Sequence, residues 1–581
     1  MLSTWEPEVV RIDADILIIG GGTAGCQAAI TAKEKNGELK VVVIEKAHVE
    51  RSGCLASGVN AINAYLNPGE TPQSYVDYVK KDTAGLIRDD LTYTIGERLN
   101  NCTRRLEEWG LPFLKDENGN YVARGRRSVR INGERIKPIL AEALRKSGAL
   151  VLNRVVATNY IVKGRKVIGA FAFSVRENKF YVIRAKAVIC ATGGAAGLYK
   201  PNNDGSARHK MWYPPFNTGT GFAMGLRAGA EMTSFEMRFI ALRIKDVLSP
   251  TGTIAQGVHA PQINARGEAY LRNYVDRSTY MRLYATLKEN REGRGPCYLD
   301  ITGLSEDYNR ILKEAYLNMS PGIVLKWADE GVEPTEKPVE ICGSEPYIVG
   351  GHGLAGYWID SRRRTTLEGL YAAGDVAGGS PKKYVTGSMA EGEIAAEDAV
   401  EYIKNITFES IDESLIKEEI QRVYTPLIRS DGYKKLGFSP DEFEERLQKI
   451  MDEYAGGISS YYEVYEEKLN IAKDLLKELQ KDVNKGYAED LHDLMKYHEV
   501  IDRILVARAV VEHLLYRKET RWRCYQERID YPYRDDEKWL KFVNSIYDSC
   551  KDEIKILERP YTNGENYLVT WLGSGMSGCK D

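Results

Sequence analysis

Short apolar runs separated by glycine-rich turns dominate the first part of the chain. Asp15-Ile-Leu-Ile-Ile-Gly20 predicts a buried strand, and the sequence through Ala28-Ala-Ile30 predicts a helix. Val41-Val-Val-Ile-Glu45 predicts a second strand. This strand, helix, strand order is the first half of a doubly wound α/β fold.

The loop between the first strand and the helix carries the spacing Gly20-x-Gly22-x-x-Gly25. Glycines at these positions permit a tight turn, let a pyrophosphate approach the backbone, and allow the helix to pack closely on the strand. Glu45 ends the second strand, near the ~20-residue offset at which an acid accepts hydrogen bonds from a ribose. The pattern predicts a dinucleotide site at the start of the helix.

Two later segments repeat the pattern of an apolar strand that enters a glycine turn. They are Ala187-Val-Ile-Cys-Ala-Thr-Gly-Gly194 and Gly369-Leu-Tyr-Ala-Ala-Gly-Asp375. Three such turns are typical of FAD-binding oxidoreductases, in which we expect Asp375 to accept from ribityl or ribose hydroxyls. A helix that begins after Gly387 is expected to point its N-terminus at the flavin ring.

The pattern of apolar and polar residues changes at two places in the chain. Between Phe235 and Cys342 it becomes mixed, and from about Asp412 apolar residues recur at helical spacing. We therefore predict a discontinuous Rossmann-like FAD-binding domain (1–234 and 345–410), an inserted α+β capping domain (235–344) and a C-terminal helical domain (411–581).

Composition narrows the class of protein. The 581 residues are 43% hydrophobic and carry 80 Lys and Arg against 83 Asp and Glu, which argues against a nucleic-acid partner. The nine cysteines are scattered and form no C-x-x-C, so neither a disulfide framework nor a zinc or iron–sulfur motif is indicated. The histidines show no spacing typical of a metal site. We found no secretory signal and no membrane span, and expect a cytoplasmic protein.

Four residues are candidates for chemistry beside a flavin. His352 stands between glycines in Gly350-Gly-His-Gly353, which leaves its imidazole accessible to a ligand. Arg238 and Arg282 border the insert, and a guanidinium is suited to a bidentate grip on sulfate, phosphate or carboxylate oxygens. Trp212 is a candidate for stacking or electron transfer, although a core tryptophan is an equal alternative.

Motifs in the same order along most of the chain resemble the flavoprotein superfamily of fumarate reductase and succinate dehydrogenase. Within it, the sequence is most similar to the α subunit of dissimilatory adenylylsulfate reductase. The segments that carry this resemblance are Arg51-Ser-Gly53 with Gly58, Ala61-Ile-Asn63, Gly133-Glu-Arg135, Ala191-Thr-Gly-Gly-Ala195, Trp212-Tyr213, Asn217-Thr-Gly219, Phe235-Glu-Met-Arg-Phe-Ile240, Glu345-Pro-Tyr-Ile-Val349, Thr386-Gly-Ser388, Glu391-Gly392 and Glu519-Thr-Arg-Trp522.

The resemblance implies a two-electron reduction of adenylylsulfate to sulfite and AMP, or the reverse. It also implies an iron–sulfur partner subunit that supplies the electrons, hence a hetero-oligomer. FAD is expected to bind without a covalent link, because the histidine that carries the flavin in covalent relatives is missing between Arg51 and Gly58. Trp212 resembles the aromatic residue through which the electrons pass.

Two sets of site residues follow from the resemblance and the glycine turns. The catalytic set is Asn63, Glu134, Arg238, Arg282 and His352. The FAD-binding set is Gly20, Gly22, Gly25, Glu45, Lys46, Ser52, Gly53, Gly193, Gly194, Trp212, Asp375, Ser388 and Glu391.

Two alternatives stay open at this point. The segment Asn264-x-Arg-Gly-Glu268 also resembles fumarate reductases, which keeps a fumarate or other enoate reductase in view. The second alternative is a subunit that uses FAD only to relay electrons within a larger complex.

Overall fold

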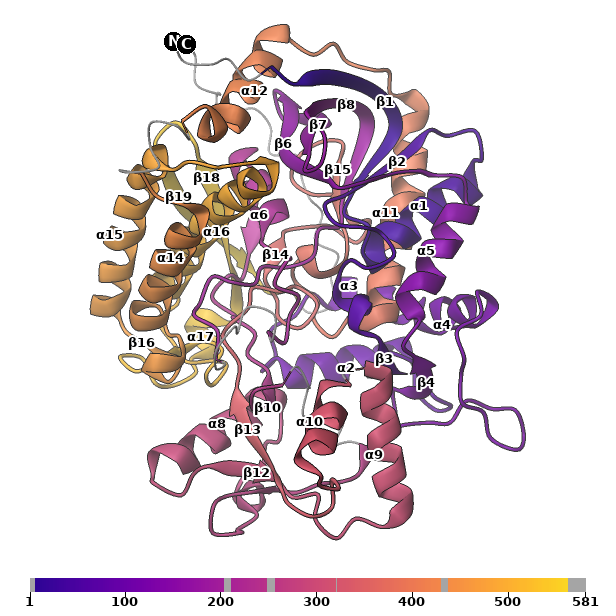
Figure 1. The fold of residues 1–581 in the computed structure, drawn as a ribbon, viewed down its shortest axis with the longest axis vertical. Coiled ribbons are helices and arrows are strands. Elements are labelled where there is room, and N and C mark those ends of the chain that lie inside the picture. Colours follow the sequence, from indigo (N-terminus) through magenta and orange to yellow (C-terminus); the bar gives the residue numbers. More distant parts are fainter. Residues whose placement is uncertain (1–5, 203–210, 248–256, 320, 430–436, 563–581) are drawn as a thin grey trace.

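A seven-stranded sheet forms the centre of the molecule in the computed structural model, which describes residues 6–202, 211–247, 257–319, 321–429 and 437–562 (Figure 1). Its order within these residues is β5-β2-β1-β8-β7-β6, and β15 pairs with β8 beside this path. The strands are β1 (Glu8–Ile19), β2 (Val41–Glu45), β5 (Leu150–Asn153), β6 (Val155–Lys163), β7 (Lys166–Ser174), β8 (Lys179–Cys190) and β15 (Leu370–Ala372).

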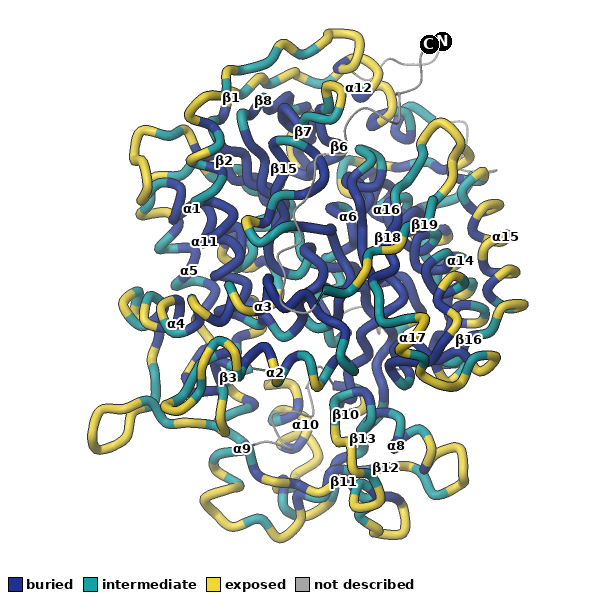
Figure 2. The backbone as a smooth tube through the Cα atoms, turned by 180° about the vertical axis from the view of Figure 1, so that it is seen from behind, coloured by how far each residue is buried: buried dark blue, intermediate teal, exposed yellow. Residues whose placement is uncertain are grey.

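The predicted β-α-β unit is confirmed. β1 runs parallel to both β2 and β8, with Ile16 opposite Val41 and Ala187. Such strands read as continuous apolar runs because helices cover both faces of a parallel sheet. In Figures 1 and 2 the helices α1 (Thr23–Lys35), α5 (Ile136–Lys146) and α11 (Tyr384–Tyr402) lie on one side, and α6 (Thr220–Arg227) and α16 (Leu491–Tyr516) lie on the other.

The mixed segment after Phe235 forms a separate layer at one end of the molecule (Figure 1). Its sheet has the order β10-β13-β12-β11. The elements of this layer are β10 (Leu242–Ile244), β11 (Gln262–Ile263), α8 (Thr279–Arg291), β12 (Cys297–Leu299), α9 (Glu306–Met319), α10 (Gly322–Glu330) and β13 (Val339–Gly343). Helix α9 contacts β3 (Val59–Ile62) and β4 (Val129–Gly133), so this layer faces the FAD-type part of the chain. The predicted α+β content is found here, while the boundaries of the four predicted segments stay predictions.

The C-terminal region contains the predicted helices and ends in an antiparallel hairpin that the helical spacing did not indicate. The helices are α12 (Glu413–Ile428), α14 (Pro440–Tyr454), α15 (Glu466–Asp482) and α16. The hairpin of β18 (Lys541–Asp548) and β19 (Glu553–Pro560) pairs with β9 (Met232–Thr233), which itself pairs with β14 (Gly356–Tyr357). This sheet joins strands from three distant parts of the sequence, a pairing that local periodicity does not encode.

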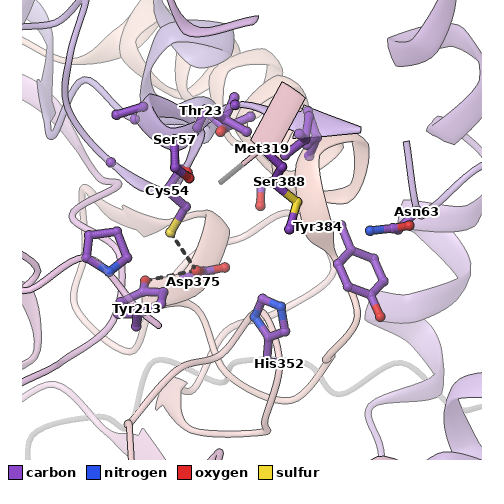
Figure 3. Close-up of a pocket in the computed structure, with 18 of the residues that line it drawn as sticks. Thr23, Cys54, Ser57, Asn63, Tyr213, Met319, His352, Asp375, Tyr384 and Ser388 are labelled. Carbon is purple, nitrogen blue, oxygen red and sulfur yellow. Dashed lines mark hydrogen bonds between the residues drawn. The ribbon is translucent and has the colours of Figure 1, made fainter. Parts of the chain in front are cut away.

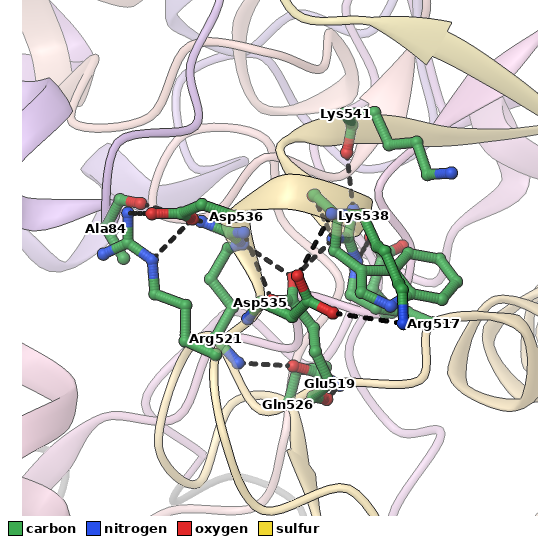
Figure 4. Close-up of polar contacts among 12 residues, drawn as sticks. Ala84, Arg517, Glu519, Arg521, Gln526, Asp535, Asp536, Lys538 and Lys541 are labelled. Carbon is green, nitrogen blue, oxygen red and sulfur yellow. Dashed lines mark hydrogen bonds and ion pairs between the residues drawn. The ribbon is translucent and has the colours of Figure 1, made fainter.

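The segment after α16 contains a buried ion-pair network (Figure 4). The Glu519 carboxylate binds Arg517 and Arg521, at 2.7 Å from each, and these side chains are fully buried. Arg521 also donates to the carbonyl of Ala84 at 3.0 Å, and Trp522 donates to that of Thr83 at 2.8 Å. These residues therefore attach the C-terminal region to the loop after α2 (Pro72–Asp82).

The remaining elements are short. They include α3 (Asp89–Gly96), α4 (Leu99–Glu108), β16 (Glu463–Val464), β17 (Glu527–Arg528) and α17 (Asp536–Trp539). Within the described residues no helix combines the length and the apolar character needed to cross a membrane. Seven described cysteines are free thiols, whereas Cys550 is disulfide-bonded, which the scattered spacing had not indicated.

Candidate functional site

A cavity of about 1330 Å³ lies between the FAD-type sheet, the inserted layer and the start of α11. Its volume exceeds the ~300–1,000 Å³ of a typical small-molecule site. Figure 3 shows side chains that enter it from several segments of the chain, among them Cys54, Asn63, Tyr213, His352 and Asp375. The cavity therefore has room for a dinucleotide and a second ligand.

The dinucleotide loop has the geometry that its glycines predict. Gly20 has φ +102°, and a Cβ added there would lie 2.5 Å from the carbonyl oxygen of Ala191. A Cβ on Gly25 would lie 1.9 Å from the carbonyl oxygen of Gly20, so this glycine packs the helix on the strand and does not line the cavity. Gly22 lines the cavity and precedes α1 without a side-chain cap. The first N–H groups of α1 are thus available to a phosphate.

Glu45 and Lys46 lie at the end of β2 and line the cavity. The Glu45 carboxylate accepts hydrogen bonds from the backbone N–H groups of Gly21 and Ala47, each at 2.8 Å. Lys46 forms an ion pair with Glu499 at 2.5 Å. The acid therefore fixes the glycine loop, in the position from which it can also accept from a ribose.

Hydrogen bonds from Tyr213 and to Glu391 fix the turn that carries Asp375. The hydroxyl of Tyr213 donates to the Asp375 carboxylate at 2.9 Å, and burial raises the pKa of this carboxyl group. Glu391 does not line the cavity; it accepts from the N–H of Gly374 at 2.8 Å and pairs with buried Lys383 at 2.9 Å. Glu391 thus positions the turn, and Asp375 lines the cavity.

Helix α11 begins at Tyr384, which corrects the predicted start after Gly387. Gly387 lies within the first turn and packs against Lys383 and Ile95. Ser388, one residue further, lines the cavity as expected. The glycine therefore marks a close contact inside the helix, not its beginning.

The other FAD-binding candidates divide between the cavity and its wall. Ser52, Gly53 and Gly193 line the cavity, whereas Gly194 lies behind it and donates to the hydroxyl of Tyr213 at 2.9 Å. The buried hydroxyl of Ser52 has no hydrogen-bond partner among the described residues. An unpaired buried hydroxyl beside the glycine turns fits a polar ligand such as FAD.

His352 lies in an aromatic cage at the other end of the cavity. Its ring centroid is 4.9 Å from that of Trp212, 4.8 Å from that of Phe239 and 5.5 Å from that of Tyr384. Burial, with a smaller effect from Lys382, lowers the pKa of the imidazole to about 3. Its buried Nδ1 has no partner among the described residues. The side chain is a neutral donor and acceptor that lines the cavity.

Asn63 and Arg282 also line the cavity. The amide oxygen of Asn63 accepts a hydrogen bond from Arg124 at 2.9 Å. Arg282 reaches the cavity from α8, and its side chain makes no hydrogen bond or ion pair with a described residue. The structure therefore brings together Asn63, Trp212, Arg282 and His352 from four separate segments.

Arg238 and Glu134 do not line the cavity. The Arg238 guanidinium is fully buried, and it donates to the backbone carbonyls of Ala455 at 2.7 Å, Tyr462 at 2.9 Å and Tyr525 at 3.0 Å. It is a connector to the C-terminal region, which corrects its expected contact with substrate oxygens. Glu134 is exposed at the end of β4, outside the cavity.

The cavity-lining residues that sequence reasoning missed include Arg124, Arg130, Tyr213 and Tyr384. Tyr384 lies between His352 and Asn63 (Figure 3). Its φ of +50°, like the +62° of Lys382, is a conformation that costs energy in a non-glycine residue and is frequent at functional sites. The Lys-Lys-Tyr sequence beside Thr386-Gly-Ser388 was the one available signal for it.

Comparisons with protein families, with individual proteins and with solved structures all identify flavoproteins of the same kind. Residues 15–389 match the FAD binding domain family, and residues 444–566 match the C-terminal family of fumarate reductase flavoproteins. The chain is 33% identical to adenylylsulfate reductase subunit alpha of Megalodesulfovibrio gigas, over 96% of both chains.

Two solved structures superpose on nearly the whole chain. Adenylylsulfate reductase from the hyperthermophilic Archaeoglobus fulgidus has a TM-score of 0.92 and 38% identity, over 96% of this chain and 97% of that one. Adenosine-5-phosphosulfate reductase in complex with sulfite, as a covalent adduct, has a TM-score of 0.91 and the same identity and coverage. The chain belongs to the adenylylsulfate reductase α-subunit family, a family of FAD-dependent oxidoreductases within the fumarate reductase and succinate dehydrogenase superfamily.

Proposed function

We propose that this chain is the flavin subunit of an adenylylsulfate reductase, which interconverts adenylylsulfate with sulfite and AMP. The observation that carries the proposal is the cavity end that unites Asn63, Trp212, Arg282 and His352 beside the predicted FAD site, in a chain similar to this family over its full length. FAD, when bound, supplies a two-electron carrier. The protein residues bind and orient the substrate.

Each side chain at this end has a role that its chemistry allows. The neutral imidazole of His352 donates one N–H to a substrate oxygen, in a cage that excludes water. Arg282 supplies a full positive charge from the inserted layer. Fixed donors of this kind stabilise negative charge that develops on oxygen in the transition state.

We propose that FAD is held without a covalent bond. Cys54 is the thiol that lines the cavity within the segment where covalent relatives carry a histidine, and its sulfur lies 4.0 Å from the Asp375 carboxylate. Burial raises the pKa of this thiol, which keeps it protonated and a poor nucleophile. Acid precipitation of the purified protein should release all flavin into the supernatant; flavin that stays in the pellet would overturn this assignment.

We propose an iron–sulfur protein as the electron partner, and Trp212 as the residue through which electrons enter. Trp212 is partly buried and contacts both His352 and Phe239. A two-electron flavin fed by one-electron donors needs such a carrier. Co-purification of an iron–sulfur chain would support the partner, and full activity of the single chain with its native donor would contradict it. The cytoplasmic location stays a prediction.

The first experiment is AMP-dependent sulfite oxidation by the anaerobically purified, FAD-loaded protein with ferricyanide as acceptor. We expect turnover that requires AMP and is lost in His352→Ala. Bound, reducible flavin with no reaction of sulfite would contradict the proposal.

The second candidate is a fumarate or other enoate reductase, favoured by the match of residues 444–566 to the fumarate reductase family. Reduction of fumarate by reduced viologen would support it. A pure electron-relay subunit is the third; in that case His352→Ala would leave the turnover of the whole complex unchanged.

A further inference from the structure

A β-hairpin beside the candidate substrate end carries four arginines, which divide into two pairs. Arg126 and Arg127 form ion pairs with Glu70, at 2.6 and 2.7 Å. All four arginines line the cavity. Glu70 thus compensates the charges of Arg126 and Arg127, whereas Arg124 donates to the amide oxygen of Asn63 at 2.9 Å.

The backbone pairing explains why Arg124 and Arg130 lie together. Ala123 bridges to Val129, the N–H of Arg124 donates to the carbonyl of Ser128 at 2.7 Å, and that of Arg130 donates to Val122 at 2.9 Å. In antiparallel pairing this register makes Arg124 and Arg130 diagonal neighbours on the same face, within reach of long side chains. Burial, together with the charge of Arg130, lowers the pKa of Arg124.

Asn63 completes the arrangement. Arg130 on β4 pairs with Ala61 on β3, two residues before Asn63. Because the Asn63 amide oxygen accepts the hydrogen bond of Arg124 at 2.9 Å, its NH2 group is left as a donor. Figure 3 shows this amide beside Tyr384 at the cavity. Two guanidinium groups and one amide NH2 therefore offer donors at this place.

The cavity lining is cationic as a whole. Seven Lys and Arg but only three Asp and Glu line it among the described residues. Three of these cations, Arg51, Arg130 and Arg282, make no side-chain hydrogen bond or ion pair within the described part of the chain. Like charges this close repel each other, and an anion between them would remove that cost.

We propose that Arg124, Arg130 and the amide of Asn63 form a subsite for a tetrahedral oxyanion, a phosphate or sulfo group of the substrate. The inference rests on the proposed function, because the two halves of adenylylsulfate each carry such a group. Planar guanidinium forks suit tetrahedral oxyanions, which offer acceptors only. Arg282 adds a further charge to the cavity from α8 of the inserted layer.

The test uses the FAD-loaded full-length protein, together with any co-purifying partner. Sulfate and inorganic phosphate are titrated at constant ionic strength, with the flavin absorbance spectrum as readout. We expect both anions to bind, and Arg124→Gln and Arg130→Gln each to weaken binding at least tenfold. Arg124→Lys should retain part of the affinity. Arg104→Gln is the matched control and should bind as the wild type does, because Arg104 is exposed, donates to Asn101 and does not line the cavity.

Flavin content and melting temperature show whether each variant is folded. If Arg124→Gln does not fold, Arg130→Gln alone provides the test. Titrations with AMP and with sulfite then distinguish the two sources, since the ligand whose affinity falls in the variants is the one held here. Unchanged affinity in both folded variants, no anion binding by the wild type, or Arg124-dependent binding of fumarate alone would each overturn the subsite.

These results separate the subsite from the proposed function. If sulfate binding depends on Arg124 but AMP-dependent sulfite oxidation is absent, the subsite holds and the proposed function fails. If the oxidation occurs and anion binding is indifferent to both substitutions, the proposed function holds and the subsite fails.

Discussion

The imidazole of His352 stands edge-on to the indole of Trp212, with ring planes at 89° and centroids 4.9 Å apart. Phe239 and Tyr384 close two further sides. An aromatic cage offers no counter-ion to an imidazolium, so the low pKa and the neutral ring follow from the burial of His352. The side chain can therefore polarise an oxygen by an N–H, but it does not carry charge at neutral pH.

Two replacements of His352 distinguish the effect of its hydrogen bond from the effect of its side-chain volume. We expect His352→Ala to lower kcat at least about 100-fold, the usual effect of removing one donor to a developing oxyanion. His352→Gln keeps an N–H donor and should retain more activity than His352→Ala at equal flavin content. Steady-state kinetics with sulfite and AMP measures both. Equal kcat in the alanine variant and the wild type would remove this residue from the mechanism.

Acid sensitivity should come in part from buried histidines. Burial lowers the pKa of His498 to about 3, and its Nε2 lies 2.9 Å from the carbonyl oxygen of Val423. Because the pKa is lower in the folded state, the unfolded state binds the proton first. The contribution of neutral His498 to the free energy of unfolding is thus fully present above the unfolded pKa of about 6.5. It is lost, by about 1.4 kcal/mol per pH unit, as the pH drops towards 3.

His498→Gln tests this relation. Glutamine can donate to the same carbonyl but does not titrate, so the loss of melting temperature between pH 7 and pH 5 should be smaller than in the wild type. His492→Gln, at the exposed start of the same helix, should not change that loss. An identical pH dependence of all three proteins would contradict the prediction.

Arg238 should contribute to stability and not to substrate binding. Arg238→Ala leaves several buried carbonyls without their donor, at a cost of roughly 3 kcal/mol or more. We expect a lower melting temperature with little change in KM for sulfite or AMP in the fraction that remains folded. A variant that is as stable as the wild type but shows a large rise in KM would restore the original assignment to the substrate site.

Glu391 should control flavin binding from outside the cavity. Glu391→Gln weakens the ion pair with buried Lys383 and the hydrogen bond to Gly374. Loss of one partner of a buried ion pair is strongly destabilising, by about 3–5 kcal/mol. We expect reduced FAD content and a lower melting temperature. Glu401→Gln, exposed on the same helix, is the control and should retain full flavin.

The glycine turns show how much of the candidate site can be predicted from local sequence. Gly20, Gly22 and Glu45 lie at the cavity as predicted, because the conformation of a tight turn and the close approach of backbone depend on residues near each other in the chain. The same reasoning placed Asp375 at the cavity. It placed Gly25, Gly194 and Glu391 there too, although these residues support the cavity wall.

Arg238 illustrates where the reasoning fails. Its sequence neighbourhood resembles a substrate site, yet its guanidinium meets the carbonyls of Ala455, Tyr462 and Tyr525, more than 200 positions away in the chain. Which partner a buried arginine finds depends on long-range packing, and the partners here come from the C-terminal region. Arg124 is the converse case, since no local signal separates it from the neighbouring Arg126 and Arg127.

The sequence by itself determined the FAD-type β-α-β unit, the inserted mixed layer and the family, because strand periodicity, glycine turns and the order of motifs are local properties of the chain. Only the tertiary structure decided which side chains share the cavity. His352, Trp212, Asn63 and Arg282 come from separate segments, and their meeting depends on how the inserted layer and α11 pack against the central sheet. Packing is a non-local property, so it separated Arg238, which binds the C-terminal region, from Arg124, Arg130 and Arg282, which line the cavity.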